Sequence, residues 1–157
     1  MSGRVARPGV KLLQWESSLR DLIASCGGLR DGHALGGVVV GGMLGTVVNG
    51  EMLEMPLKQL ASHGVQLGHG AIIAFSDRDD LNAIVLLMSQ FLAAESCGHC
   101  TPCRNGTVKA VAHLMSGGNV QQLADLGFLM KEASACGLGR SAGRFLERSI
   151  SLLKEHT

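Results

Sequence analysis

Residues 95–104 read Glu-Ser-Cys-Gly-His-Cys-Thr-Pro-Cys-Arg, and three cysteines, Cys97, Cys100 and Cys103, occupy every third position. A fourth cysteine, Cys136, lies further along the chain in Ser-Ala-Cys-Gly-Leu-Gly. Four cysteine thiolates are the usual ligand set of a cubane iron–sulfur cluster. The motif therefore predicts a cluster with three ligands on one tight loop and one from a distant segment, which ties the two segments together.

Other metal chemistries fit the spacing less well. Structural zinc sites also use four thiolates, but they usually combine two separated Cys-x-x-Cys pairs, whereas three candidate ligands crowd one loop here. A bacterial ferredoxin has three residues between its third and fourth cysteines and follows the fourth with proline, and this chain does not. One [4Fe-4S] cluster is the favoured interpretation, with zinc and metal-free buried thiols as alternatives. The remaining cysteine, Cys26, is predicted to be a small buried hydrophobe.

Residues beside the cysteines are predicted to surround the cluster without ligating it. Arg104 follows the third cysteine, and its positive charge would stabilise the reduced form of an anionic cluster. Backbone amides can approach sulfur at glycines of the two motifs, namely Gly98, Gly106, Gly137 and Gly139. His99 is expected at the surface or beside the ligands rather than as a ligand, because four cysteines already complete the ligand set.

Composition limits the class of protein. The chain has 157 residues and a formal charge of +1 without blocks of like charge, which argues against nucleic acid as a partner. Its start is polar, with no signal peptide, and its longest apolar run is too short to span a bilayer. Cysteines this close together suggest metal chemistry in a reducing compartment rather than disulfides. We therefore expect a cytoplasmic protein without direct membrane insertion.

The first half predicts a small lobe of strands and one helix. The helix begins at Leu19, after the capping pair Ser17-Ser18, and ends at Cys26-Gly27-Gly28. Strands are expected over 35–40 and 71–75, because these stretches are rich in β-branched and apolar residues. The predicted divisions are a loose arm at 1–8, a lobe at 9–48 and a connecting segment at 49–79.

The second half, residues 80–157, predicts four helices. Apolar residues at helical spacing indicate helices over 81–94 and 107–115, a third that Asn119 caps and that ends near Cys136, and a fourth over 141–154. The sequence thus predicts an α+β protein in which a four-helix bundle carrying the iron–sulfur cluster follows the lobe.

Residues 95–106, together with Cys-Gly-Leu-Gly at 136–139, resemble a motif of the NADH-oxidising flavoprotein subunit of respiratory complex I. The same motif occurs in β subunits of NAD-dependent formate dehydrogenases and in diaphorase subunits of hydrogenases. Upstream segments resemble the ubiquitin-like β-grasp (SLBB) part of that family: they are residues 7–9, 18–23, 26–30, 40–42 and 64–74.

The resemblance implies a function for the cysteines. In that family they hold a [4Fe-4S] cluster that takes electrons from a flavin and passes them to further clusters. By resemblance, Cys97, Cys100, Cys103 and Cys136 would do so here, as part of an electron-transfer subunit rather than a catalyst. The expected partners are subunits of an oxidoreductase complex that carry flavin, iron–sulfur or metal active sites, in the cytoplasm or at the cytoplasmic face of the membrane.

The chain also departs from the family pattern. The glycine-rich loops of the family's FMN and NADH domain are missing, so no flavin or nicotinamide site is expected. Asn105 stands where members tend to carry glutamate, and residues 143–145 stand where a proline is usual. An electron relay is the first hypothesis. The alternative is a structural or docking subunit in which the cluster, or zinc, only stabilises the fold and has no redox role.

Overall fold

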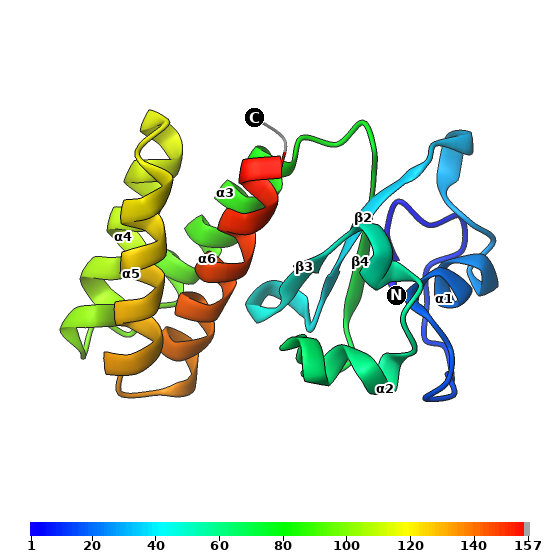
Figure 1. Cartoon of the computed structure of the whole chain (residues 1–157), viewed down its shortest axis with the longest axis horizontal. Helices are drawn as coiled ribbons and strands as arrows, with labels where there is room; N and C mark the ends of the chain where they lie inside the picture. Colours follow the sequence, from blue (N-terminus) through cyan, green and yellow to red (C-terminus); the bar gives the residue numbers. More distant parts are fainter. Residues whose placement is uncertain (156–157) are drawn as a thin grey trace. The chain divides into compact units, whose positions relative to one another are not determined.

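The computed structural model describes residues 1–155, apart from the side chains of Asp31 and residues 151–155. The chain has a mixed α+β fold and separates into two compact units, Met1–Asp79 and Asp80–Thr157 (Figure 1). The first unit holds a four-stranded sheet, and the second holds the long helices.

The sheet of the first unit has the strand order β1-β4-β2-β3. The strands are β1 (Ser2–Gly3), β2 (Leu35–Val40), β3 (Thr46–Val48) and β4 (Ile72–Ser76). β2 pairs antiparallel with both β3 and β4, so that Val39 lies opposite Val47 on one side and Ile73 on the other. β1 runs parallel to β4. The β-branched residues of β2 are buried, as expected for a central strand.

Helix α1 (Leu19–Ser25) covers part of this core with its apolar side. Ser18 caps it: the Ser18 hydroxyl accepts from the Asp21 N–H, and the Asp21 carboxylate accepts from the Ser18 N–H. Leu19, Leu22 and Ile23 are buried, and the helix ends at Ser25 with Cys26 as its C-cap, so the predicted stop at Cys26-Gly27-Gly28 is confirmed. A short helix α2 (Leu57–Leu60) and single 3-10 turns lie along the connections; the turns span Arg30–Gly32, Gly42–Leu44, Gly50–Leu53 and Ala61–His63.

Two segments are more ordered than the sequence suggests. The expected loose arm, residues 1–8, instead supplies β1 and the fully buried Val5, which bridges Leu29. Within the expected connecting segment, residues 49–79, the strand predicted over 71–75 is present as β4, and Leu53, Leu57 and Leu60 add side chains to the core of the same unit. The order of residues 1–8 depends on pairing with distant residues, which local sequence does not reveal.

The second unit consists of α3 (Leu81–Ala94), α4 (Thr101–Ser116), α5 (Val120–Ala133) and α6 (Gly137–Glu155), coloured from green to red in Figure 1. α3 matches the predicted bounds, and Asp80 caps it by accepting from the Asn82 N–H at 2.8 Å. Asn119 caps α5 in the same way, as predicted. α5 packs along α6 and α3 along α4, around buried side chains that include Val85, Leu92, Met130 and Phe145.

Two of these helices begin earlier than predicted. α4 begins at Thr101 rather than residue 107, because Pro102 in the first turn needs no amide partner and suits a helix start. α6 begins at Gly137 rather than residue 141, despite two glycines in its first turn. The cysteine motif is therefore not a loop throughout: Cys103 lies on α4, and Cys136 directly precedes α6.

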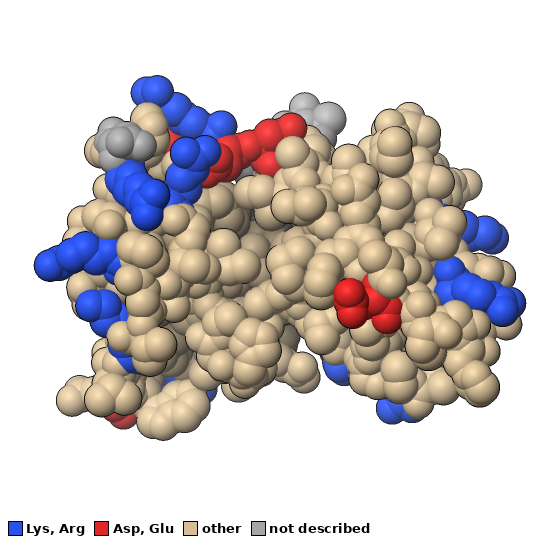
Figure 2. Space-filling model, turned by 180° about the vertical axis from the view of Figure 1, so that it is seen from behind, with Lys and Arg blue, Asp and Glu red and all other residues tan. Residues whose placement is uncertain are grey.

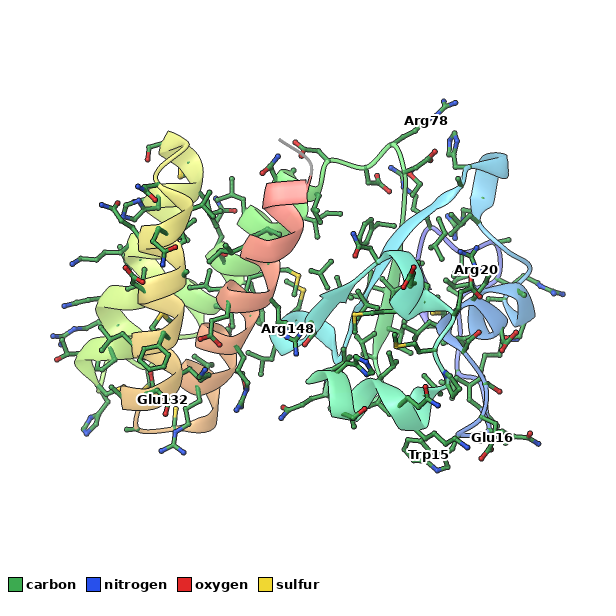
Figure 3. The ribbon with its side chains drawn as sticks, in the orientation of Figure 1. Trp15, Glu16, Arg20, Arg78, Glu132 and Arg148 are labelled. Carbon is green, nitrogen blue, oxygen red and sulfur yellow. The ribbon has the colours of Figure 1, made fainter. Side chains whose placement is uncertain are left out.

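Charge is sparse on the surface. On the face that Figure 2 shows, uncharged residues make up most of the area, in keeping with a charged fraction of 17%. Figure 3 shows Trp15 and Glu16 on the loop before α1; the Trp15 ring is 62% exposed. Glu132, labelled near the end of α5, is exposed. Within residues 1–155, none of the helices has the length and apolar character needed to span a bilayer.

Candidate iron–sulfur centre

Three of the candidate ligands lie at the junction of α3 and α4. Cys97 is exposed in the connection, Cys100 is half-buried at the N-cap of α4, and Cys103 is buried in its first turn. Gly98 lies between the first two, with φ of 74°, in the left-handed region that glycine tolerates best. One short connection and one helix start therefore position all three thiols.

The fourth candidate ligand lies at the junction of α5 and α6. α5 ends at Ala133, Ser134 caps it, and Cys136 is exposed immediately before α6. The Arg140 Nε donates to the Ser134 carbonyl oxygen at 3.0 Å, which fixes this short connection to the first turn of α6. The fourth thiol is thus also positioned at a helix start.

The fold brings the two junctions together. The backbone N–H of Ala135, the residue before Cys136, donates a hydrogen bond to the Sγ of Cys100. A Cβ placed on Gly139 would lie 2.9 Å from the Cβ of Cys103, so α6 passes close to α4 at this point. Within the described residues, no three cysteine, histidine or acidic side chains are grouped around one point as ligands of a single ion.

The local electrostatics favour a thiolate at Cys100. Hydrogen bonds from the backbone N–H groups of Ala135 and Cys103 lower the pKa of Cys100, and the Arg104 charge lowers it further. The N-termini of α4 and α6 both adjoin the cysteines, and helix N-termini carry partial positive charge. This part of the unit therefore suits an anionic group.

The residues predicted to surround the cluster differ in how close they lie to the cysteines and in what they contact. Arg104 donates from Nη1 to the Gly98 carbonyl oxygen at 3.3 Å, which folds its side chain back over the cysteine connection. Gly137 lies beside Cys136 with open space around it, and His99 is exposed. Gly106 has a different role from the predicted one: a Cβ there would lie 2.5 Å from Met130 Sδ, so it allows close packing of α4 on α5.

Two serine hydroxyls lie beside the cysteines, and neither is singled out by the sequence motif. Ser96 Oγ is 3.4 Å from Cys103 Sγ and also accepts from the Gly98 N–H. Ser134 is buried between α5 and α6, close to Cys103 and Gly139. The only signal in the sequence is that each serine lies within two residues of a motif cysteine.

The donor set fits an iron–sulfur cluster. It offers four thiols from two segments held in contact, backbone N–H groups directed at sulfur, and two helix N-termini that favour negative charge. Such amides and helix ends stabilise the anionic thiolate ligands that clusters require.

Comparison with known proteins connects this site to a family. Residues 83–156 match the family described as the NADH-ubiquinone oxidoreductase-F iron-sulfur binding region. Over 99% of its length the chain is 31% identical to the NADH-quinone oxidoreductase F subunit of Streptomyces coelicolor, and over 98% it is 29% identical to the Escherichia coli protein of the same name.

A solved structure is similar in both sequence and fold. A chain in the crystal structure of an NAD+-reducing [NiFe]-hydrogenase in the H2-reduced state matches 98% of this chain, with 30% identity and a TM-score of 0.81. This chain spans 36% and 37% of the two NADH-quinone oxidoreductase relatives and 27% of the hydrogenase chain. The match to the NADH-ubiquinone oxidoreductase-F iron-sulfur binding region over residues 83–156 therefore includes all four motif cysteines.

Proposed function

We propose that Cys97, Cys100, Cys103 and Cys136 ligate one [4Fe-4S] cluster, through which the chain relays single electrons between cofactors of neighbouring subunits in an oxidoreductase complex. The close approach of the two cysteine segments carries this proposal: a Cβ on Gly139, three residues after Cys136, would lie 2.9 Å from the Cβ of Cys103. The Ala135 N–H, which lowers the pKa of Cys100, is a second link between them. When bound, the cluster supplies a one-electron donor and acceptor.

Burial differs among the four cysteines, and this gives the site a protein side and a solvent side. Cys103 is 4% exposed and lies on the side of the helix core, where packed side chains keep water away. Cys97 and Cys136 are exposed, so the cofactor of a neighbouring subunit can approach the site from their side. Arg104 and the amides of the two helix starts stabilise added negative charge, which favours reduction.

The family supports a place in a larger assembly. The relatives are named as subunits of NADH-quinone oxidoreductase, and the similar structure is that of a hydrogenase. In our proposal the host is such a complex or a formate dehydrogenase, in the cytoplasm or at the cytoplasmic face of the membrane. Partner subunits supply flavin, further clusters or a metal active site, and residues 97–136 of this chain supply the electron relay.

Each unit has its own part in this proposal. The helices of the second unit, residues 80–157, form a four-helix bundle that holds the cluster. The first unit is an SLBB-like β-grasp lobe that docks on a partner. The first unit has a mixed sheet, in which β1 and β4 are parallel and the other neighbouring strands are antiparallel, and one helix packs on it. This arrangement supports the assignment.

Cluster content tests the ligand set. We expect the full chain, purified without oxygen and supplied with iron and sulfide, to bind about four irons and four sulfides. Cys136→Ala should lose the four-iron species, whereas Cys26→Ala, at the buried cysteine of the first unit, should retain it. Zinc in place of iron, or fewer than about three irons in intact wild-type protein, would overturn the proposal.

A redox titration separates electron transfer from a purely structural role. We expect the bound cluster to take up one electron reversibly and to show an electron paramagnetic resonance signal when reduced. In the host complex, Cys100→Ala should abolish electron flow between the partner cofactors. A cluster that cannot be reduced, together with full turnover of that variant, would instead indicate a structural or docking role.

A further inference from the structure

Ser134 is a buried serine whose hydroxyl has no partner. The residue is 2% exposed, and among the buried side-chain polar atoms that the structure describes, Ser134 Oγ alone lacks a hydrogen bond. A buried hydroxyl without a partner has lost its hydrogen bonds to water and destabilises the fold, and folded proteins rarely leave one in that state. This hydroxyl therefore requires an explanation.

The other polar groups of Ser134 are already engaged. Its backbone N–H donates to the Met130 carbonyl oxygen at 3.1 Å, and its carbonyl oxygen accepts from Arg140 Nε at 3.0 Å. These two hydrogen bonds fix the backbone of Ser134 between α5 and α6. The hydroxyl is thus held in place by contacts in which it takes no part.

The hydroxyl lies next to the cysteine site. A Cβ built on Gly139 would stand 2.5 Å from Ser134 Oγ and 2.9 Å from the Cβ of Cys103. The serine hydroxyl and the Cys103 side chain therefore border the same small space, which stays open because residue 139 is glycine. Ser134 also lies two residues before Cys136. The unpaired donor is accordingly placed among two of the proposed ligands.

We propose that Ser134 donates a hydrogen bond to a sulfur atom of the cluster and raises its reduction potential; this step rests on the cluster assignment proposed above. Cysteine or sulfide sulfur bound to iron carries no proton, so the hydroxyl must be the donor. Such a hydrogen bond strengthens as negative charge accumulates on the cluster, and therefore favours the reduced form.

Ser96 provides an internal comparison. Its Oγ is 3.4 Å from Cys103 Sγ and accepts from the Gly98 N–H, so this hydroxyl has partners within the chain. Among the described residues, Ser134 Oγ has no such partner. Of the two serines, Ser134 is therefore the one whose hydroxyl is left to donate to a sulfur of the cluster.

The reduction potential of the cluster-loaded full chain tests this proposal. The midpoint potential is measured in a redox titration followed by electron paramagnetic resonance. At a fixed potential, Ser134→Ala should lower the ratio of reduced to oxidised cluster tenfold, which corresponds to a midpoint potential lower by ~59 mV for one electron. Ser149→Ala is the matched control, because Ser149 is equally buried but its hydroxyl already donates to the Phe145 carbonyl oxygen at 2.8 Å. That variant should leave the potential unchanged.

Distinct results would overturn the two proposals. An unchanged potential in Ser134→Ala, with wild-type iron content, would overturn the role of Ser134 and leave the cluster assignment standing. A wild-type chain that binds no four-iron cluster would overturn both. If Ser134→Ala does not assemble a cluster, Ser134→Thr keeps the hydroxyl and should retain the wild-type potential; a lowered potential in that variant would contradict the proposal.

Discussion

The backbone N–H of Ala135 donates a hydrogen bond to the Sγ of Cys100, and this contact joins two helix junctions that are far apart in sequence. It is the largest cause of the lowered pKa of Cys100. Because the donor belongs to the main chain, its effect depends on how α5 and α6 are connected rather than on the identity of any side chain. The two junctions therefore act together as one site.

Arg104 should have a small effect on the potential of the proposed cluster. Its guanidinium is exposed, and solvent and salt weaken interactions of exposed charges. We expect Arg104→Gln to lower the midpoint potential by less than the ~59 mV of a tenfold change, and the difference to shrink as salt is added. Lys109→Gln is the control, since Lys109 is also exposed on α4 but lies about 9 Å further along the helix axis than Cys103. An effect of Arg104→Gln that does not depend on salt would contradict this explanation.

Asp79 should make the stability of the first unit depend on pH under acidic conditions. Arg4 holds the pKa of Asp79 at about 2, with help from hydrogen bonds that the carboxylate accepts from Ser76. An unfolded aspartate has a pKa of about 3.9, so the folded state favours the charged form. The stabilisation is therefore complete at neutral pH and is lost as pH falls from about 4 to about 2.

The measurement compares unfolding of wild type and Asp79→Asn by urea at a series of pH values. We expect the difference in the free energy of unfolding to stay constant between about pH 6 and 8 and to shrink below about pH 4. Asp77→Asn serves as the control, because the Asp77 side chain is exposed on the same loop. A difference that grows on acidification would show that the sign is wrong.

Gly143 should be intolerant of a side chain. A Cβ at this position would lie 2.4 Å from the Lys131 amide nitrogen and 2.5 Å from the Gly127 carbonyl oxygen, where the backbones of α5 and α6 approach each other. We expect Gly143→Ala to lower the free energy of unfolding by about 1–3 kcal/mol, despite a gain in helix propensity of up to about 1 kcal/mol. Gly137→Ala, at the open start of the same helix, should not destabilise the chain. Thermal unfolding followed by circular dichroism would check both variants.

Cys26 should affect stability without affecting iron. Its side chain is fully buried in the apolar core of the first unit, to which Leu22 and Ile23, one helical turn earlier, also belong. Cys26→Ser places a hydroxyl in that core, and we expect a loss of about 1–3 kcal/mol in the free energy of unfolding. Iron content should equal that of wild type, and a loss of iron in a folded variant would mean that Cys26 contributes to the metal site.

Local patterns predicted the parts of the fold that local interactions determine. The bounds of α3 and the capping of α1 by Ser18 follow from helical periodicity and a capping residue, and both are confirmed. The start of α4 was predicted too late because Thr101–Gly106 contains few apolar residues, so periodicity gives no signal there. The proline in its first turn was the usable evidence, since proline is favoured at helix starts.

Contacts between distant residues could not be predicted in this way. Nothing near Ser2 or Gly3 indicates that they pair with Ile73 and Ala74, because the pairing depends on the whole sheet. The same limit applies to the site: the spacing of the cysteines predicted a remote fourth ligand, but not the unpaired hydroxyl of Ser134. A donor without a partner can be recognised only when its surroundings are known.

The separation of the two cysteine segments has a consequence for assembly. Closing a long loop costs entropy, so contacts between residues far apart in sequence form late unless other interactions bring them together. The segment of Cys136 reaches Cys100 only when α5 and α6 have docked on α4. Insertion of the proposed four-iron cluster should therefore follow folding of the helices, so that a chain with undocked α5 and α6 would offer only three of its four thiols at one place.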